Sequence, residues 1–524
     1  MNDAGYVVKG GQRLRRGYTT GTCAAAAARA AAAMLLTGET VSQVRIRTPK
    51  GPVLDLEIED IRRSPEAVSC AVRKDSGDDP DVTNHALIYA RVGWSDEPGV
   101  RIEGGEGVGR VTKPGLDQPV GAAAINSTPR RMIREAVLEA AAEAVRTGAG
   151  KAAAEAGRPG TGQADGEDAD RVPESVPAGP GGAGADKTPR GFDVTISVPL
   201  GRELAAKTFN PRLGIEGGIS ILGTSGIVEP MSDRALLETI RTEIRVRSCE
   251  GYPVLAAAPG NYGRNFFLET YGFSLDTAVT SSNFIYDTVR MAAEAGFEKL
   301  LFIGHIGKLV KVAGGVRNTH SQYGDRRMEI LSSITRDCML KAAMAQKDSS
   351  PEAEDPGRGP VKGKTPEAAV PELPERKTPE AAVPELPERK APEAAGPGLS
   401  EKKTPEAAGA GACSGEAEES VLTRLADCVA TDEAVRILKE CGLDKPVLAE
   451  MTLRIREVME TWAEGKMQVE VIVFSNVWGE LGRTDRALDY MQVIRGYSSR
   501  PLEGREHVTL RSAIPMRLRA AERR

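Results

Sequence analysis

The stretch from residue 282 to residue 315, SNFIYDTVRMAAEAGFEKLLFIGHIGKLVKVAGG, decides the fold class. Up to Gly296 it has the apolar spacing of a helix, and LLFI is a short buried strand that runs into a glycine-rich loop. Helices that alternate with buried strands are typical of a mostly parallel sheet, in which ligands bind beyond the carboxyl ends of the strands. We therefore expect an α/β domain here.

The same pattern recurs on both sides of this stretch, with strands predicted in 253–258 and 468–476 and helices in 234–245, 432–442 and 448–465. Four glycine-rich loops contain hydrogen-bond donors or cations: LGTSG (222–226), PGNYGRN (259–265), GHIGK (304–308) and SNVWGELG (475–482). Glycine permits a ligand to approach the backbone closely. We expect the four loops to converge at one rim that suits a nucleotide-like molecule or a large acid, although each loop alone is equally compatible with an ordinary turn.

The N-terminal part has a different character, beginning with RRGYTTGTCAAAAARAAAAMLLTGE (15–39). One of Thr19, Thr20 and Thr22 is expected to cap a helix that runs through the alanines and ends at Gly38. Capping needs one hydroxyl, so two threonines are left over. A helix start with Arg15 and Arg16 just upstream also suits an anion, and both interpretations remain open.

Alternating polar and apolar residues in 43–49, 54–62 and 67–74 predict antiparallel strands, and a helix is expected from Thr128 and Pro129 onward. The strands lead to KDSGDDPDVTNH (74–85), an acidic turn without the glutamate of a calcium loop. A solvated turn is the simpler interpretation of this segment. The fold class predicted for the whole chain is thus α/β and α+β, with an antiparallel N-terminal α+β domain and a mostly parallel α/β domain.

Two segments have few large apolar residues and are expected to be disordered insertions: 149–190, rich in Gly, Pro and Ala, and 346–419, in which KTPEAAVPELPER occurs twice. They divide the chain into an N-terminal α+β domain (1–148, completed by 191–225), the first part of the α/β domain (226–345) and its second part (420–524).

The composition limits the compartment and the partners. The net charge of −5 is spread over the chain and favours neither nucleic acid nor membrane as partner. Seven cysteines without a CxxC pair fit free thiols in the cytoplasm, and no segment is apolar enough to span a bilayer. The sequence does not set the oligomeric state, and a homo-oligomer is compatible with it.

Few residues are suited to metal binding or nucleophilic catalysis. The four histidines form no metal-ligand pair, so we expect no protein-bound metal. His320 lies among polar residues, which favours a site role over a core position. Cys23 at the predicted helix start is either a nucleophile or a buried thiol, and a buried thiol is favoured because no base lies beside it.

Seven motifs resemble, in their order along the chain, those of the CbiD family, the cobalt-precorrin-5B C1-methyltransferases of the anaerobic cobalamin (vitamin B12) pathway. The motifs lie in all three parts of the chain and skip both insertions: LRRGYTTGTCAAAAARAA, GDDPDVT, GVGRVTKPGL, PVGAAAIN, GGISILGTSGIVEPMS, GHIGKLVKVAGGVRNTHS and VFSNVWGELG.

The resemblance implies transfer of a methyl group from S-adenosyl-L-methionine to C1 of cobalt-precorrin-5B, which gives cobalt-precorrin-6A. The cobalt belongs to the substrate, an anionic corrinoid whose carboxylates call for cations and helix N-termini. The residues expected to bind it are Arg15, Arg16, Thr19, Thr20, Thr22, Lys308, Arg317, His320 and Arg326. For the methyl donor we expect Gly223, Thr224, Ser225, Gly226, Gly260 and Gly304, and for handling a proton on the ring Asp78 and Asp79.

Two other functions compete with the methyltransferase. A non-catalytic corrinoid carrier would need no S-adenosylmethionine, and a hydrolase based on Cys23 would lose its activity with that thiol. The order of the motifs along the chain favours the methyltransferase over both.

Overall fold

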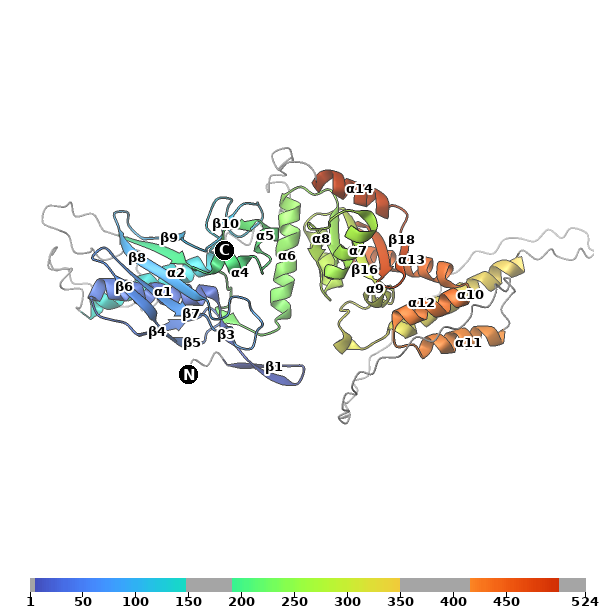
Figure 1. The fold of residues 1–524 in the computed structure, drawn as a ribbon, viewed down its shortest axis with the longest axis horizontal. Helices are drawn as coiled ribbons and strands as arrows, with labels where there is room; N and C mark the ends of the chain where they lie inside the picture. The colour runs from blue at the N-terminus through green and yellow to red at the C-terminus, as the bar shows by residue number, and fades with distance from the viewer. Residues whose placement is uncertain (1–4, 148–190, 349–414, 499–524) are drawn as a thin grey trace, which may run out of the picture.

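The computed structural model describes residues 5–147, 191–348 and 415–498. Two large hydrophobic cores divide these residues, one built from 18–141 with 192–227 and one from 240–339 with 421–473. In Figure 1 the two parts lie side by side, with the long helix α6 (Asp233–Cys249) between them. The predicted class, an antiparallel α+β part followed by an α/β part, is confirmed.

The N-terminal part contains a five-stranded sheet with the order β6-β7-β8-β11-β9 and several short strand pairs. Neighbours in this sheet are antiparallel except for β11 and β9, which run parallel. The strands of this part are β1 (Tyr6–Lys9), β2 (Gln12–Arg15), β3 (Gly17–Tyr18), β4 (Gln43–Arg47), β5 (Val53–Glu57), β6 (Glu59–Arg63), β7 (Ala67–Arg73), β8 (Leu87–Ser95), β9 (Val100–Gly104), β10 (Arg110–Val111), β11 (Gly191–Ser197), β12 (Ile215–Glu216) and β13 (Ile227–Val228).

The alanine-rich helix α1 (Thr20–Thr37) is the centre of the N-terminal core. It contacts α2 (Ser127–Arg146), strands β7 and β8, and β4. Eight of its alanines, Ala24–Ala28 and Ala30–Ala32, are fully buried, because a methyl side chain lets helix and sheet backbones approach from several sides. As predicted, Thr19 caps the helix and Gly38 ends it in a left-handed conformation with φ of 73°.

The second part is a three-layer α/β domain around a five-stranded sheet of order β15-β14-β16-β17-β18. Its first four strands run parallel and β18 is antiparallel, so the prediction of a mostly parallel sheet is confirmed. The strands are β14 (Leu255–Ala258), β15 (Val279–Thr280), β16 (Lys299–His305), β17 (Gln468–Ser475) and β18 (Gly479–Arg483).

Helices cover both faces of this sheet (Figure 1). Helices α7 and α14 pack on one face, and α6 and α8 to α13 contribute to the core on the opposite face, whereas α4 and α5 belong to the N-terminal part. The helices from α4 onward are α4 (Gly201–Ala205), α5 (Asn210–Leu213), α6, α7 (Asn261–Tyr271), α8 (Ile285–Glu294), α9 (Ile306–Ala313), η1 (Ser321–Tyr323), α10 (Arg327–Asp348), α11 (Gly415–Ala426), α12 (Thr431–Glu440), α13 (Asp444–Trp462) and α14 (Ala487–Ser498).

The structure corrects the expectation that four glycine-rich loops share one rim. Those after β14, β16 and β17 do lie at the carboxyl edge of the parallel sheet, but 222–226 belongs to the N-terminal part. Its backbone bonds to the start of α1, and β13 directly after it pairs with β3. A second correction concerns Gly479–Arg483, which forms the edge strand β18 instead of a loop.

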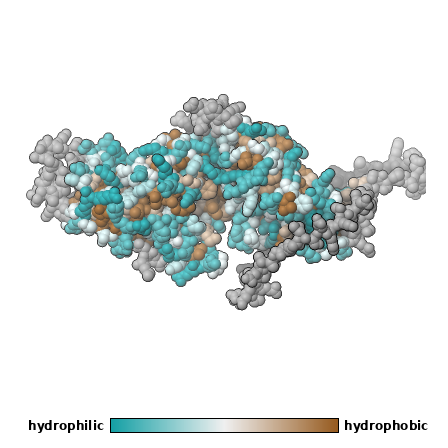
Figure 2. Space-filling model, in the orientation of Figure 1, coloured by the Kyte–Doolittle hydropathy of each residue, from teal (hydrophilic) through white to brown (hydrophobic). Residues whose placement is uncertain are grey.

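The two expected insertions lie outside the described residues, apart from their edges. Helix α10 continues to Asp348 and α11 begins at Gly415, so helical structure extends a few residues into the range 346–419 from each side. Hydrophilic side chains cover much of the face in Figure 2, and hydrophobic side chains gather in a band over the N-terminal part on its left. Among the described residues, no helix is both long and apolar enough to cross a membrane.

Candidate functional site

The three threonines at the start of α1 bind the loop 222–226. Thr20 Oγ1 lies 3.0 Å from the amide of Leu222 and accepts its hydrogen bond, and Thr22 Oγ1 donates to Gly226 O at 2.7 Å. A Cβ at Gly223 would lie 2.2 Å from Thr19 Oγ1. The threonines are 0–6% exposed, so this helix start receives a segment of its own chain. The extra hydroxyls, beyond the one needed for capping, join two segments about 200 residues apart in the sequence.

The arginine pair before these threonines meets the acidic turn. Arg15 forms a bidentate ion pair with Asp75, at 2.6 and 2.8 Å, which lowers the pKa of that carboxyl group. Asp78, exposed at the same turn, accepts the backbone N–H of Arg15 at 2.6 Å. The backbone around Arg15 and the acidic turn can approach this closely only with glycine on both sides, because a Cβ on Gly17 or on Gly77 would lie 2.2 Å from the facing backbone.

A third motif segment completes this cluster. Asp79 Oδ1 accepts the amide of Met231 at 3.1 Å, and Glu229 lies 3.7 Å from Arg16 and 2.9 Å from Lys50. The Nε atom of Arg16 is buried and has no hydrogen-bond partner among the described residues. The tertiary structure thus brings together three motifs that are far apart in the sequence: RRGYTTGT, GDDPD and GTSGIVEPM.

The carboxyl edge of the parallel sheet holds the other predicted residues. Gly260 precedes α7 and has open space where a Cβ would point, whereas a Cβ on Gly304 would lie 2.8 Å from Leu309. The close packing of Leu309 is therefore sufficient to explain why glycine occupies position 304. Lys308 donates to Asn283 Oδ1 at 2.7 Å, and burial lowers the pKa of its ammonium group. The roles predicted for these residues remain predictions.

His305 ends β16 at the centre of this edge and caps α9. Its Nδ1 accepts the amide of Gly307 at 3.1 Å, so the neutral ring carries its proton on Nε2. Burial lowers the pKa of His305 below 6.5, although the nearby carboxylate of Asp432 opposes the shift. The ring meets Phe474 edge-on, with 5.6 Å between the centroids.

Replacing His305→Asn is expected to reduce the acid sensitivity of folding. Because burial holds the folded-state pKa below 6.5, the unfolded chain binds the proton more readily, and stability falls as pH drops from 6.5 toward the folded-state value. Asparagine keeps a side-chain acceptor at the helix cap and does not titrate. Melting temperatures measured at pH about 7.5 and about 5 should differ less for the variant than for the unmodified protein. Equal differences would contradict the prediction.

The remaining predicted substrate residues lie between α9 and α10 and do not form one cluster. Arg317 stacks over Tyr286, with its guanidinium carbon 4.6 Å from the ring centroid. His320 is exposed and caps η1. Arg326 pairs with Glu329 at 2.5 Å on the surface. Among the described residues, no group of three or more His, Cys, Asp or Glu side chains is arranged to hold a metal ion.

Cys23 has the environment of a structural thiol. It is fully buried in α1, and burial raises its pKa to about 12. A thiol of that pKa carries almost no thiolate at neutral pH, so the geometry does not support the hydrolase hypothesis.

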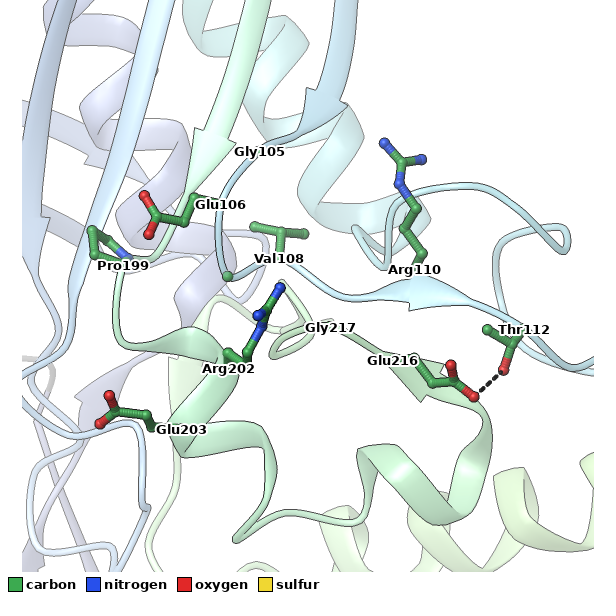
Figure 3. A pocket seen from close by; sticks show the side chains of 11 residues that line it. Gly105, Glu106, Val108, Arg110, Thr112, Pro199, Arg202, Glu203, Glu216 and Gly217 are labelled. Atoms are coloured by element: carbon green, nitrogen blue, oxygen red, sulfur yellow. Dashed lines mark hydrogen bonds between the residues drawn. The ribbon is translucent and has the colours of Figure 1, made fainter.

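An open pocket of about 680 Å³ lies in the N-terminal part, beside the GVGRVTKPGL motif (Figure 3). This volume lies within the range of small-molecule binding pockets, about 300–1,000 Å³. Five of the pocket's eleven lining residues are charged, and in Figure 3 the side chain of Arg202 reaches toward Val108 and Gly217. The lining comprises residues 105–108, Arg110, Thr112, Pro199, Arg202, Glu203, Glu216 and Gly217.

Backbone segments pack directly against each other under this pocket. A Cβ on Gly107 would lie 1.8 Å from Val198 O, and Cβ atoms on Gly201 and Gly218 would lie 2.0 and 2.1 Å from Gly107 O. Sequence reasoning missed Arg202, Glu203 and Glu216 as site residues. The available signal was glycine beside charge in three segments, LGRE (200–203), EGG (216–218) and GEGVGR (105–110).

A buried charge network connects the N-terminal part to the α/β domain through α6. Glu250 is 4% exposed, pairs with Arg247 at 2.5 Å, and receives Lys113 of the GVGRVTKPGL motif at 3.1 Å. Glu243, in α6 and seven residues before Glu250, accepts a hydrogen bond from the amide of Thr280 at the end of β15, at 2.8 Å. Arg212 of α5 donates to Ala278 O, just before β15, so α5 contacts the edge strand of the sheet.

Two models of known protein families match parts of this chain. The family model described as CbiD matches residues 7–158 and 181–230. The model of the CbiD C-terminal domain matches residues 408–485. Both matches include residues of the structural parts described above.

Curated relatives match over most of their own length. Cobalt-precorrin-5B C(1)-methyltransferase of Ruminiclostridium cellulolyticum is 45% identical over 333 residues, which cover 64% of this chain and 76% of the relative. The protein of the same name from Alkaliphilus metalliredigens is 45% identical over 328 residues, covering 63% and 75%. A crystal structure of the cobalamin biosynthesis protein cbiD from Archaeoglobus fulgidus is similar at 26% identity, with a TM-score of 0.29, and covers 59% of this chain and 83% of that one. The sequence identity and the two family matches show that the chain belongs to the CbiD family.

Proposed function

We propose that this chain transfers the methyl group of S-adenosylmethionine to C1 of cobalt-precorrin-5B in cobalamin biosynthesis. The observation that carries the proposal is 45% identity over 333 residues to a relative of that name. The same family motifs form the structural junctions described above, including the three that meet at Arg15, Asp79 and loop 222–226.

The chemistry requires positioning more than covalent catalysis. The donor supplies an electrophilic methyl group, and a nucleophilic ring carbon must lie in line with it. The chain contributes by holding both reactants at near-attack distance, which is worth up to about 7–11 kcal/mol of the barrier. The threonine-lined junction at α1 and the charge network at α6 supply rigid supports for such positioning.

For the anionic macrocycle we propose the carboxyl edge of the α/β sheet and the cations around it. Lys308 lies at that edge and Arg317 presents an exposed guanidinium, whereas Arg16, which has an unpaired buried Nε–H, lies in the N-terminal part. Each has donor capacity left for a carboxylate. Arg15 and Arg326 are already paired with Asp75 and Glu329, so a substrate would have to share them.

Asp78 and Asp79 remain the proposed acid–base residues for a proton on the ring. Their carboxylates also bind backbone amides of Arg15 and Met231, which gives them a structural task. Separate Asp78→Asn and Asp79→Asn variants distinguish the two roles. A proton-transfer role predicts a loss in kcat of about 100-fold or more with an unchanged melting temperature. A structural role predicts reduced stability with nearly normal turnover of the folded fraction.

The test of the proposed function is anaerobic incubation of the full chain with cobalt-precorrin-5B and S-adenosylmethionine that carries a labelled methyl group. Mass spectrometry should detect one labelled methyl in the corrinoid product. Corrinoid binding without transfer and without affinity for S-adenosylmethionine would instead identify a carrier.

A further inference from the structure

Charge gives the pocket of Figure 3 a distinct ligand preference. Its wall contains three carboxylates, Glu106, Glu203 and Glu216, and two guanidiniums, Arg110 and Arg202. The side chains therefore sum to a formal charge of −1. A polycarboxylate macrocycle is repelled by such a wall, whereas a ligand with excess positive charge is attracted.

The bonding of these groups shows which of them are available. Arg110 donates to Gly121 O at 3.0 Å and to Glu103 at 3.3 Å, and Glu216 accepts a 3.5 Å hydrogen bond from Thr112. The side chains of Glu106, Glu203 and Arg202 form no hydrogen bond or ion pair with the described residues. Two free carboxylates and one free guanidinium thus belong to residues that line the same pocket, as does Gly217.

This combination matches an amino acid that carries an additional cation. A free guanidinium suits the α-carboxylate, and free carboxylates suit the α-ammonium and a second positive charge. Among the reactants of the proposed function, S-adenosylmethionine has this pattern, because its sulfonium adds one positive charge to the zwitterion. After transfer the sulfur is a neutral thioether, so S-adenosylhomocysteine lacks that charge.

We propose that the pocket beside GVGRVTKPGL binds the methyl donor and that its carboxylates discriminate the donor from its product by charge. The inference rests on the proposed function. It places the donor in the N-terminal part, at a pocket that contains none of the residues predicted for the donor from the sequence, which are 223–226, Gly260 and Gly304. Glu216 and Gly217 of the pocket follow α5, whose Arg212 contacts the α/β domain at Ala278, just before β15. Loss of the sulfonium charge then weakens the hold on the product and promotes its release.

The test is calorimetric titration of the full chain with S-adenosylmethionine, S-adenosylhomocysteine and 5′-methylthioadenosine, which lacks the amino acid. The unmodified protein should bind the donor several-fold more tightly than the product. In the triple variant Glu106→Gln/Glu203→Gln/Glu216→Gln, donor affinity should fall by at least about tenfold and the preference should approach one. Added salt should reduce donor affinity more than product affinity.

Two further variants separate the proposal from its alternatives. Arg202→Met should lower the affinities for the donor and for the product by a similar factor. It should leave the affinity for 5′-methylthioadenosine unchanged, because that ligand has no carboxylate. Glu66→Gln neutralises one carboxylate at an exposed site in the turn between β6 and β7 and should change none of the affinities.

Distinct results overturn the inference and the proposed function. If the triple variant binds the donor like the unmodified protein, the pocket is not the donor site. If donor affinity is lost in Gly260→Val instead, the donor binds at the sheet edge; a Cβ there points into open space, so the variant should fold. If the unmodified protein binds no S-adenosylmethionine at all, the proposed function itself fails.

Discussion

Replacing Gly107→Ala is expected to destabilise the N-terminal part by about 3–5 kcal/mol, since the added methyl group meets two separate penalties. Its Cβ would lie 1.8 Å from the carbonyl oxygen of Val198, which cannot move without displacing the chain around Gly201. The residue also has φ of +71°, a conformation that costs a non-glycine residue about 1–2 kcal/mol.

Gly217→Ala is the matched control for this prediction. Gly217 lines the same pocket and has φ of +83°, but its Cβ would have no atom within 4 Å. Gly217→Ala should therefore lower the free energy of unfolding only by the cost of the left-handed backbone conformation, about 1–2 kcal/mol. Urea unfolding followed by tryptophan fluorescence measures both variants in a background of Trp462→Phe and Trp478→Phe, so that the signal comes from Trp94, which stacks on Phe192 in this part. Equal losses for the two variants would show that the backbone contact at Gly107 carries no energetic weight.

The second large effect is expected for Glu250→Gln, which should lower the free energy of unfolding by about 3–5 kcal/mol. Glu250 is 4% exposed and compensates both Arg247, at 2.5 Å, and Lys113, at 3.1 Å. Glutamine preserves the size of the side chain and removes its charge, which leaves a buried guanidinium without its counter-ion. Because Lys113 belongs to the N-terminal part and Arg247 to α6, the loss should also weaken the contact between the two parts.

An exposed ion pair provides the comparison. Asp55→Asn removes the partner of Arg45 on the surface hairpin β4–β5 and should cost less than about 1 kcal/mol. Thermal unfolding followed by circular dichroism gives the difference in stability, and limited proteolysis reports cleavage near α6. If Glu250→Gln is no more destabilising than Asp55→Asn, the buried network does not hold the two parts together.

The sequence alone determined the class of the fold and several of its elements. The alanine-rich helix with a threonine cap and its end at Gly38, the antiparallel strands before the acidic turn, and the parallel strands around 299–305 all follow from local periodicity and glycine placement. Such signals are local, because helix and strand periods appear within a few residues of the chain. Motif order along the chain similarly identified the family that the comparisons show.

Only the tertiary structure decided which loops meet. The loop 222–226 has the composition of the sheet-edge loops, yet it closes the start of α1 through Thr20 and Thr22, because long-range partners are not encoded in local composition. The pocket shows the same limit. Glu106, Arg202 and Glu216 come from three separate segments, and glycine contacts between backbones, such as Gly107 against Val198, bring them to one wall. Which charged side chains share a pocket wall depends on how distant segments pack, and that packing forms only when the whole chain folds.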